Sequence, residues 1–140
     1  MTDLLHRIKI FVFRMQERTP DYLLLRGPGV ESFWGPIQGP IGFGEKLEAA
    51  IRREVMDDVG IAKPLDLIDL QMPGPSLWGD EEGVEWTFGF RSPGQAAELR
   101  LAERWSEFQW APFPHAYPSL ELENDRAAIM RLHTLLHDAA

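Results

Sequence analysis

The stretch GPIGFGEKLEAAIRREVMDDVGI, residues 39–61, joins a glycine-rich segment to a run of helical periodicity that carries three clustered acids. Apolar residues recur at the spacing of one helix face, namely Leu47, Ala50, Ile51, Val55 and Val59. On a helical wheel Glu54 and Asp58 fall inside this apolar sector, and Asp57 lies at its edge. Acids in such a sector lose water and rarely stay there unpaired. The stretch therefore predicts a helix whose acids have a partner.

A divalent cation is the partner that this acidic pattern favours. Carboxylates three and four residues apart lie side by side on a helix and repel one another unless a cation holds them. Hard oxygen ligands of this kind suit Mg²⁺ or Mn²⁺. The preceding glycines allow the backbone to approach a phosphate or an ion closely. The alternative is a solvated acidic face, which is the usual meaning of a charge run.

Length and composition limit the class of protein. The chain has 140 residues, no cysteine and ordinary apolar and charged contents, so we expect one globular domain over 1–140, without disulfides or thiolate metal sites. The apolar run near the N-terminus is too short and too charged for a signal peptide or a membrane span. A cytoplasmic protein that binds no membrane is expected. The formal net charge of -8 argues against binding to a nucleic-acid backbone.

Strand and helix patterns alternate along the chain and predict a mixed sheet with helices packed on it, an α/β (α+β) fold. Strands are predicted at 7–15, 21–27, 65–72, 84–92 and 106–112, the first two as a hairpin. Helices are predicted at 46–59, closed by Gly60, and at 123–139, with Asn124 as its N-cap. A long loop with short extended pieces is predicted at 27–44, and a surface loop is predicted at 73–83.

The stretch 39–61 resembles the signature of the Nudix (MutT-like) hydrolases. That signature is Gly, five residues, Glu, seven residues, Arg-Glu, an aliphatic residue, any residue, Glu-Glu, any residue, Gly and an aliphatic residue. Every spacing is kept here, by Gly39, Glu45, Arg53, Glu54, Val55, Asp57, Asp58, Gly60 and Ile61. Only the Glu-Glu pair differs, being Asp-Asp. The segment FWGPIQGPIGFGE, 33–45, is similar to members that cleave dATP or dihydroneopterin triphosphate.

The resemblance implies an α/β/α sandwich with a mixed sheet and helices on both faces. It implies metal-dependent hydrolysis of a nucleoside diphosphate linked to another group, most closely pyrophosphohydrolysis of a (deoxy)nucleoside or pterin triphosphate. The metal ligands would be Glu54, Asp57 and Asp58, with the carbonyl of Gly39, and Mg²⁺ or Mn²⁺ as the ion. An ion pair between Glu45 and Arg53 would tie the loop to the helix.

Several roles stay open. The attacking water would be oriented by a helix acid or by a later carboxylate, for which the candidates are Glu107, Glu82 and Glu85. A nucleotide-binding module with weak or no turnover is the alternative function, because aspartate is shorter than glutamate. The partner in either case is a small nucleotide or pterin polyphosphate, and the protein would be a monomer or a homodimer.

Substrate contacts are predicted for three residues before the signature. Arg26 would reach a phosphate or end a solvated strand. Phe33 and Trp34 would stack on a base or pterin ring, or anchor the loop instead. Trp78 would belong to a lid over the substrate or only pack its own loop.

His133 and His137 lie four apart near the C-terminus, and we expect both to be exposed and without a role.

Overall fold

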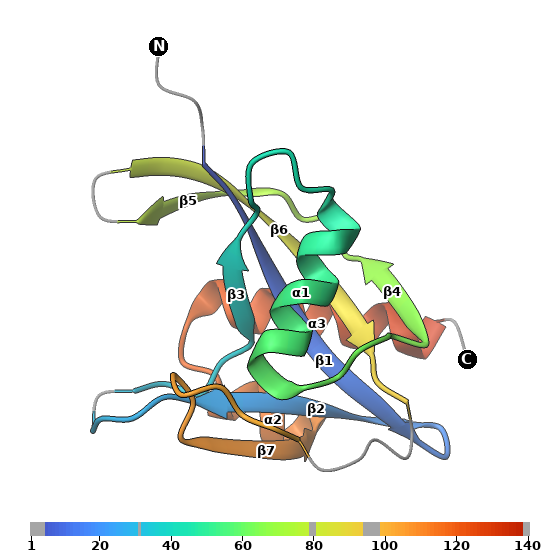
Figure 1. The fold of residues 1–140 in the computed structure, drawn as a ribbon. Helices are drawn as coiled ribbons and strands as arrows, with labels where there is room; N and C mark the ends of the chain where they lie inside the picture. The colour runs from blue at the N-terminus through green and yellow to red at the C-terminus, as the bar shows by residue number, and fades with distance from the viewer. Residues whose placement is uncertain (1–4, 31, 79–80, 94–98, 139–140) are drawn as a thin grey trace.

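Seven strands form one mixed sheet in the computed structural model, which describes residues 5–30, 32–78, 81–93 and 99–138 (Figure 1). The strands are β1 (Leu5–Gln16), β2 (Thr19–Arg26), β3 (Ile37–Pro40), β4 (Asp66–Asp69), β5 (Gly74–Trp78), β6 (Glu81–Arg91) and β7 (Glu107–Pro112). The main path through the sheet is β4-β6-β1-β2-β7, while β3 pairs with β1 and β5 pairs with β6. The predicted hairpin of the first two strands is confirmed.

Strand β1 organises the sheet because it pairs on both edges. It runs parallel to β6 and antiparallel to β2 and β3. Its side chains alternate between two apolar sets, as expected for a strand covered on both faces. Ile8, Ile10 and Val12 belong to one buried cluster, and Phe11 and Phe13 belong to the other.

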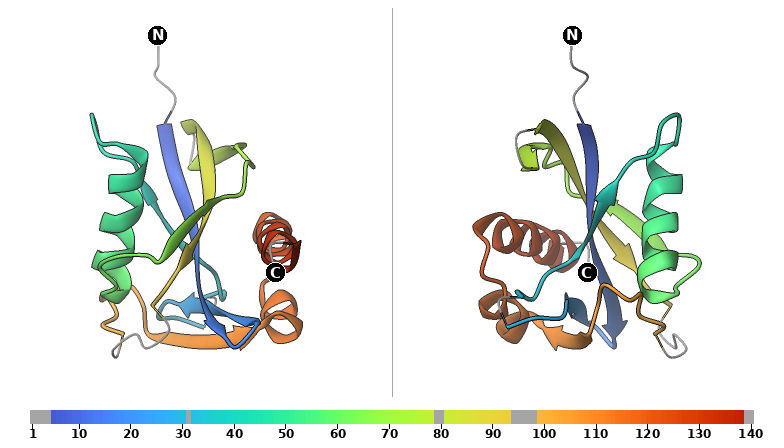
Figure 2. Two further views of the ribbon diagram at one scale, coloured as in Figure 1. Left: turned by 90° about the vertical axis from the view of Figure 1, so that its right-hand side faces the viewer. Right: turned by 60° about the vertical axis from the view of Figure 1, so that its left-hand side comes forward.

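One helix covers one face of the sheet and two helices cover the other (Figure 2). Helix α1 (Leu47–Val59) packs Ile51 and Val55 into the cluster of Ile8. Helices α2 (Phe113–Ser119) and α3 (Glu123–Asp138) contribute to the cluster of Phe11. The predicted α/β/α sandwich with a mixed sheet is therefore confirmed.

The predicted elements differ from the structure where short pieces depend on neighbours. Strand β3 is a short extended piece of the kind expected within the loop 27–44, whereas β5 lies within 73–83, which was predicted as a surface loop. Each is held by pairing with a long strand, and such pairing can override weak local propensity. Helix α2 was not predicted because two prolines interrupt its short sequence. Helix α3 begins one residue before Asn124, so this residue lies in the first turn and not at the N-cap.

The expectation of an exposed, idle residue was wrong for His133. Its Nδ1 lies 2.6 Å from the Tyr22 hydroxyl, and its ring stacks on Phe113 with centroids 4.1 Å apart. His133 thus fixes α3 to β2 and α2, while His137 is exposed as expected. In the part of the chain that the structure describes, no helix is long and apolar enough to cross a membrane.

Candidate active site

Helix α1 buries two of its three clustered acids against the sheet. Counted over the whole residue, Glu54 is 6% exposed and Asp58 is 4% exposed, as the wheel predicted, whereas Asp57 is exposed. Within the described ranges, no group of three or more His, Cys, Asp or Glu side chains gathers in a way that could hold a metal ion. The structure therefore brings together Glu54 and Asp58 but not the three predicted carboxylates.

The carboxylate of Glu54 lies directly against the backbone of β3. A Cβ atom added to Gly39 would stand 2.3 Å from both Cδ and Oε1 of Glu54, so this approach requires glycine. Gly39 is opposite Ile8 in the ladder with β1. The carbonyl oxygen of Gln38, one residue before the predicted ligand Gly39, lies beside Asp58, because it accepts from the same guanidinium that pairs with Asp58. The Gly39 carbonyl stays a predicted ligand.

Arg53 connects the glycine-rich loop to the acid pair. Its guanidinium donates to both carboxylate oxygens of Glu45, at 2.8 and 3.0 Å, to Glu54 at 2.7 Å and to the carbonyl of Pro40 at 2.9 Å. The hydrogen bonds from Arg53, followed by one from the Gly42 amide, lower the pKa of Glu45 to about 2. The same contact with Glu45 raises the pKa of Arg53. The structure thus contains the ion pair that the resemblance implied.

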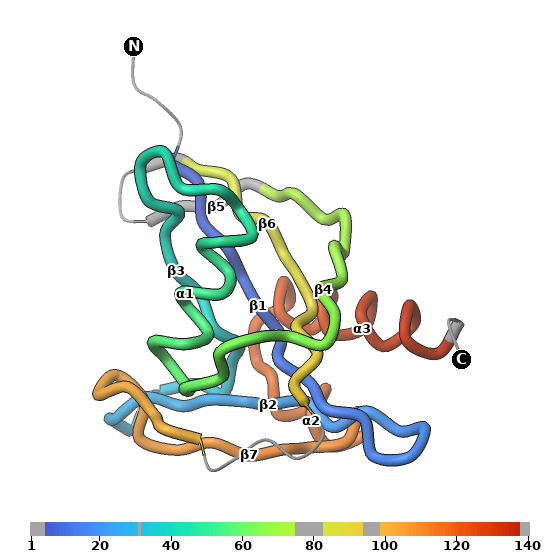
Figure 3. Tube along the Cα trace, turned by 45° about the vertical axis from the view of Figure 1, so that its right-hand side comes forward, coloured from blue at the N-terminus to red at the C-terminus, as the bar shows by residue number. Residues whose placement is uncertain are grey.

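Arg104 and Trp105 complete the surroundings of Asp58, and neither was singled out from the sequence. Arg104 forms an ion pair with Asp58, and the Trp105 indole donates to the same carboxylate oxygen at 3.1 Å. Both lie in the segment between β6 and β7, beside the C-terminal end of α1 (Figure 3). The segment ERWSEFQWAP, 103–112, resembles a Glu-rich segment of the family, but no local pattern in it predicts a contact with α1, since only the chain path brings Arg104 and Trp105 to the helix.

A second polar group lies on the opposite face of β3. The Lys9 ammonium is 2.7 Å from Asp125 and 3.2 Å from Glu85, and the Gln38 side-chain amide donates to Glu85 at 3.0 Å. Lys9 is 4% exposed. Because side chains alternate along β1, Lys9 faces the same side of the sheet as Phe11, opposite to Ile8 and Ile10. A cleft of about 370 Å³ adjoins this group, lined by Lys9, Met72, Pro73, Gly74, Glu85, Thr87, Asn124, Ala127 and Ala128.

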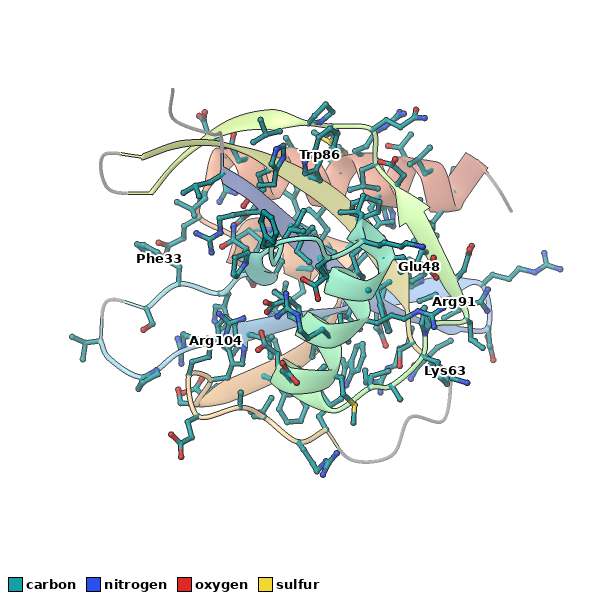
Figure 4. All side chains as sticks on the ribbon, turned by 45° about the horizontal axis from the view of Figure 1, so that its top comes forward. Phe33, Glu48, Lys63, Trp86, Arg91 and Arg104 are labelled. Atoms are coloured by element: carbon teal, nitrogen blue, oxygen red, sulfur yellow. The ribbon has the colours of Figure 1, made fainter. Side chains whose placement is uncertain are left out.

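The predicted substrate residues lie in two different settings. Arg26 stacks on Trp34, with its guanidinium carbon 4.6 Å from the ring centroid, and also pairs with Glu107. Phe33 is 52% exposed on the loop between β2 and β3, away from the helix that carries the acids (Figure 4). Of the candidate water-orienting acids, Glu107 and Glu85 are thus both ion-paired, and the Glu82 and Trp78 side chains lie outside the described part.

The oxygen donors at the acid pair fit a hard divalent cation. They are the carboxylates of Glu54 and Asp58 and the carbonyl of Gln38, all oxygen ligands of the type that Mg²⁺ and Mn²⁺ prefer. The glycine that lets β3 approach Glu54 keeps this carbonyl near the carboxylates. Two carboxylates and a carbonyl leave positions for water and substrate oxygens, as is usual for magnesium.

The family of this chain follows from comparison with known domains. The family model of the NUDIX domain matches residues 5–132, which cover the sheet, the acid pair and most of α3. The chain belongs to the Nudix family. The spacing of the signature and the buried acid pair of this Nudix domain agree with that assignment.

Solved structures share the Nudix fold at low sequence identity. A NUDIX protein of Listeria monocytogenes has a TM-score of 0.83 and 15% identity, covering 99% of this chain and 97% of its own. The dihydroneopterin triphosphate pyrophosphohydrolase of E. coli has a TM-score of 0.73 and 19% identity, covering 89% of this chain and 91% of its own. The NUDIX domain of Shewanella oneidensis NrtR, complexed with ADP ribose, has a TM-score of 0.75 and 18% identity, covering 97% of this chain and 90% of its own. No curated protein matches the chain in sequence.

Proposed function

We propose that this Nudix protein hydrolyses a phosphoanhydride bond in a nucleoside or pterin triphosphate, with the help of Mg²⁺ or Mn²⁺. One observation carries the proposal. Glu54 is buried, lies against the backbone of β3 and is held by Arg53, in a chain that keeps every spacing of the Nudix signature. A buried acid fixed in this way is suited to a catalytic site.

Some residues of the site would bind the metal, and others would hold these ligands in position. Arg53 orients Glu54 and, through Glu45, keeps the glycine-rich loop closed on the helix. Glu54 and Asp58 would hold the metal together with the Gln38 carbonyl, and one of these acids would orient the attacking water. When bound, a divalent cation supplies positive charge that stabilises the oxygens of the diphosphate. Asp57 stays a proposed ligand, since its exposure leaves it free to reach metal-bound water.

The cleft beside Lys9 is the best candidate seat for the ring of the substrate. Its volume of about 370 Å³ is within the usual range for small-molecule sites, and its lining combines apolar Met72 and Pro73 with polar Thr87 and Asn124. Gln38 links this cleft to the acid pair, because its side chain bonds to Glu85 and its carbonyl lies beside Asp58. The part of the substrate that extends beyond this cleft would pass the stacked side chains of Arg26 and Trp34.

Turnover of a substrate panel tests the proposed function. Purified protein is incubated with Mg²⁺ or Mn²⁺ and dATP, 8-oxo-dGTP, dinucleoside polyphosphates, ADP-ribose or dihydroneopterin triphosphate, and phosphate and pyrophosphate are measured. We expect release of pyrophosphate from a triphosphate, and a loss of on the order of 100-fold in rate for Glu54→Gln. The Arg52→Gln variant is the control, since Arg52 pairs with exposed Glu48 on the outer face of the same helix and with no other acid in the part of the chain that the structure describes. The proposal fails if wild type and Glu54→Gln react alike.

A second candidate is a nucleotide-binding module without turnover. The observation that favours it is that Asp57 is exposed and Asp58 is paired with Arg104, so the acids are not assembled as three carboxylates. Equilibrium binding of the same panel, measured by calorimetry, separates the two functions. Binding of a nucleotide that remains intact after prolonged incubation with either metal supports the module.

A further inference from the structure

The guanidinium of Arg104 lies among the oxygens that the proposed function assigns to a metal ion. It pairs with Asp58, lies 3.0 Å from the Gln38 carbonyl oxygen and lies 3.7 Å from Oε2 of Glu54. These are one carboxylate oxygen of each buried acid and a carbonyl oxygen beside them. Arg104 is therefore the cation beside Asp58 and the second cation beside Glu54, whose other carboxylate oxygen is bonded to Arg53.

The backbone around Arg104 is held in place, so its position does not depend on the side chain alone. The amide of Ala102 donates to the Asp58 carbonyl at 2.9 Å, and the amide of Ser106 donates to the Arg26 carbonyl at 2.9 Å. A Cβ atom on Gly27 would stand 2.9 Å from the Arg104 carbonyl oxygen, which shows how closely the two segments pack. The segment on both sides of Arg104 is thus anchored to α1 and β2 and aims the side chain at the acids.

The outer side of Arg104 has a route to solvent. Its side chain is 45% exposed, whereas those of Glu54 and Asp58 are 8% and 6% exposed. Figure 4 shows Arg104 at the side of the molecule, next to α1. Its guanidinium lies over the Trp105 ring at 4.9 Å, and the Trp105 indole would remain bonded to Asp58 if the guanidinium left. Departure of Arg104 would therefore open the acids without disturbing the core.

We propose that Arg104 is the resident counterion of Asp58 and of the Glu54 oxygen that faces it, and that a divalent cation binds these oxygens only after the guanidinium has moved out. The inference rests on the proposed function for the identity of the site. Guanidinium and metal cannot share the same carboxylate oxygens, because two cations there would repel. Arg104 thus weakens metal binding in the free protein, and once displaced its charge becomes available to a phosphate of the substrate.

Binding of Mn²⁺ without substrate tests the inference. Free Mn²⁺ is counted by electron paramagnetic resonance for wild type, Arg104→Gln, Arg100→Gln and the Arg104→Gln, Asp58→Asn double variant. Removal of the competing guanidinium should tighten Mn²⁺ binding by at least about tenfold. Arg100 is exposed in the same segment, so Arg100→Gln removes the same charge from nearby and controls for the long-range field. That variant should stay within about twofold of wild type.

Two further readouts identify the mechanism. The double variant should lose the gain in Mn²⁺ affinity, since Asp58 is one of the acids that Arg104 blocks. Without metal, Arg104→Gln should melt at a lower temperature than wild type, because Asp58 loses its counterion and Glu54 keeps only Arg53. Bound Mn²⁺ should remove this difference in melting temperature. If Arg104→Gln folds poorly, Arg104→Lys, which keeps the charge on a shorter side chain, should give an intermediate Mn²⁺ affinity.

Equal Mn²⁺ affinity in wild type and Arg104→Gln would overturn the inference, as would weaker binding in the variant. Absence of Mn²⁺ binding in all four proteins would overturn it as well, because the freed acids would then not be a metal site. The proposed function is judged separately, by whether wild type hydrolyses a member of the substrate panel. Wild type could pass that test while Arg104→Gln shows unchanged affinity, so the two failures are distinguishable.

Discussion

Gly39 and Glu54 touch across the junction between β3 and α1, since a Cβ atom at position 39 would lie 2.3 Å from the Glu54 carboxylate carbon. This contact explains why the signature begins with glycine although Gly39 has no positive φ. Glycine is needed here for space, not for backbone freedom. The strand backbone and the buried acid therefore form one unit, and a change at either residue should disturb the other.

Gly39→Ala should lower both stability and activity. The new methyl group has to displace Glu54 or the strand, and overpacking of this kind costs about 1–3 kcal/mol of unfolding free energy. Denaturation by urea and the rate on the best substrate of the panel measure the two effects. Gly74→Ala is the matched control for stability, because a Cβ atom there meets nothing within 4 Å. A similar loss of unfolding free energy in both variants would show that the Glu54 contact is not the cause.

Arg53→Ala should destabilise the protein and slow hydrolysis together. The variant removes the bonds to Glu45 and to the Pro40 carbonyl and leaves buried Glu54 without this partner, which should cost about 1–3 kcal/mol. Thermal melting and initial rates are the measurements. Arg52→Ala, which breaks only the exposed pair with Glu48, should cost about 0.3–0.5 kcal/mol. An unchanged melting temperature and rate for Arg53→Ala would remove its positioning role.

The pair of Glu45 and Arg53 should give stability a specific dependence on pH. The pKa of Glu45 is lowered from 4.5 to about 2 in the folded protein, so the unfolded state binds its proton first. The stabilisation is thus fully present above about pH 4.5 and is lost as the pH falls toward 2. Urea denaturation at several pH values compares wild type with Glu45→Gln. The difference in unfolding free energy should be constant from pH 7 to 5 and shrink below 4.5, and a difference that grows on acidification would contradict the pairing.

Local patterns predicted the parts of the site that one element carries. The wheel placed Glu54 and Asp58 in the buried sector of α1 because helix geometry depends only on residues three and four apart. Local patterns could not predict the partners that come from distant segments of the chain. Arg104 reaches Asp58 across 46 residues, and Lys9 reaches Asp125 from the other end of the chain. These meetings are fixed by the pairing of β1, β2 and β7, which a local pattern does not specify.

The fold could be predicted as a class but not in all its pieces. The long strands β1 and β6 are apolar enough to be recognised alone, and α1 has a clear stripe and a Gly60 cap with φ of 81°. The four residues of β3 include Gly39 and Pro40, so only their pairing with β1 makes them a strand. The metal-binding role of Asp57 stays a prediction, since its exposure neither supplies nor excludes a ligand.

The Asp-Asp pair is where this chain departs from the family signature, and the structure separates its two members. Asp58 is 4% exposed and already contacts Arg104 and Trp105, so an added methylene there has little room. Asp57 is exposed, and a longer side chain there meets no packing barrier. An aspartate oxygen stops about 1.5 Å short of the reach of glutamate, and Mg²⁺ does not accept longer bonds, so water is expected to bridge the gap.

Asp57→Glu should therefore lower the concentration of Mg²⁺ or Mn²⁺ needed for half-maximal hydrolysis, with little change in melting temperature. Asp58→Glu should reduce the melting temperature, because overpacking a buried site costs about 1–3 kcal/mol. The double variant should combine both effects. Titration of each metal against rate, with melting curves for wild type, both single variants and the double variant, measures them. If Asp58→Glu alone lowers the metal requirement at unchanged stability, the buried aspartate has room to spare, and the assignment of the longer reach to position 57 is wrong.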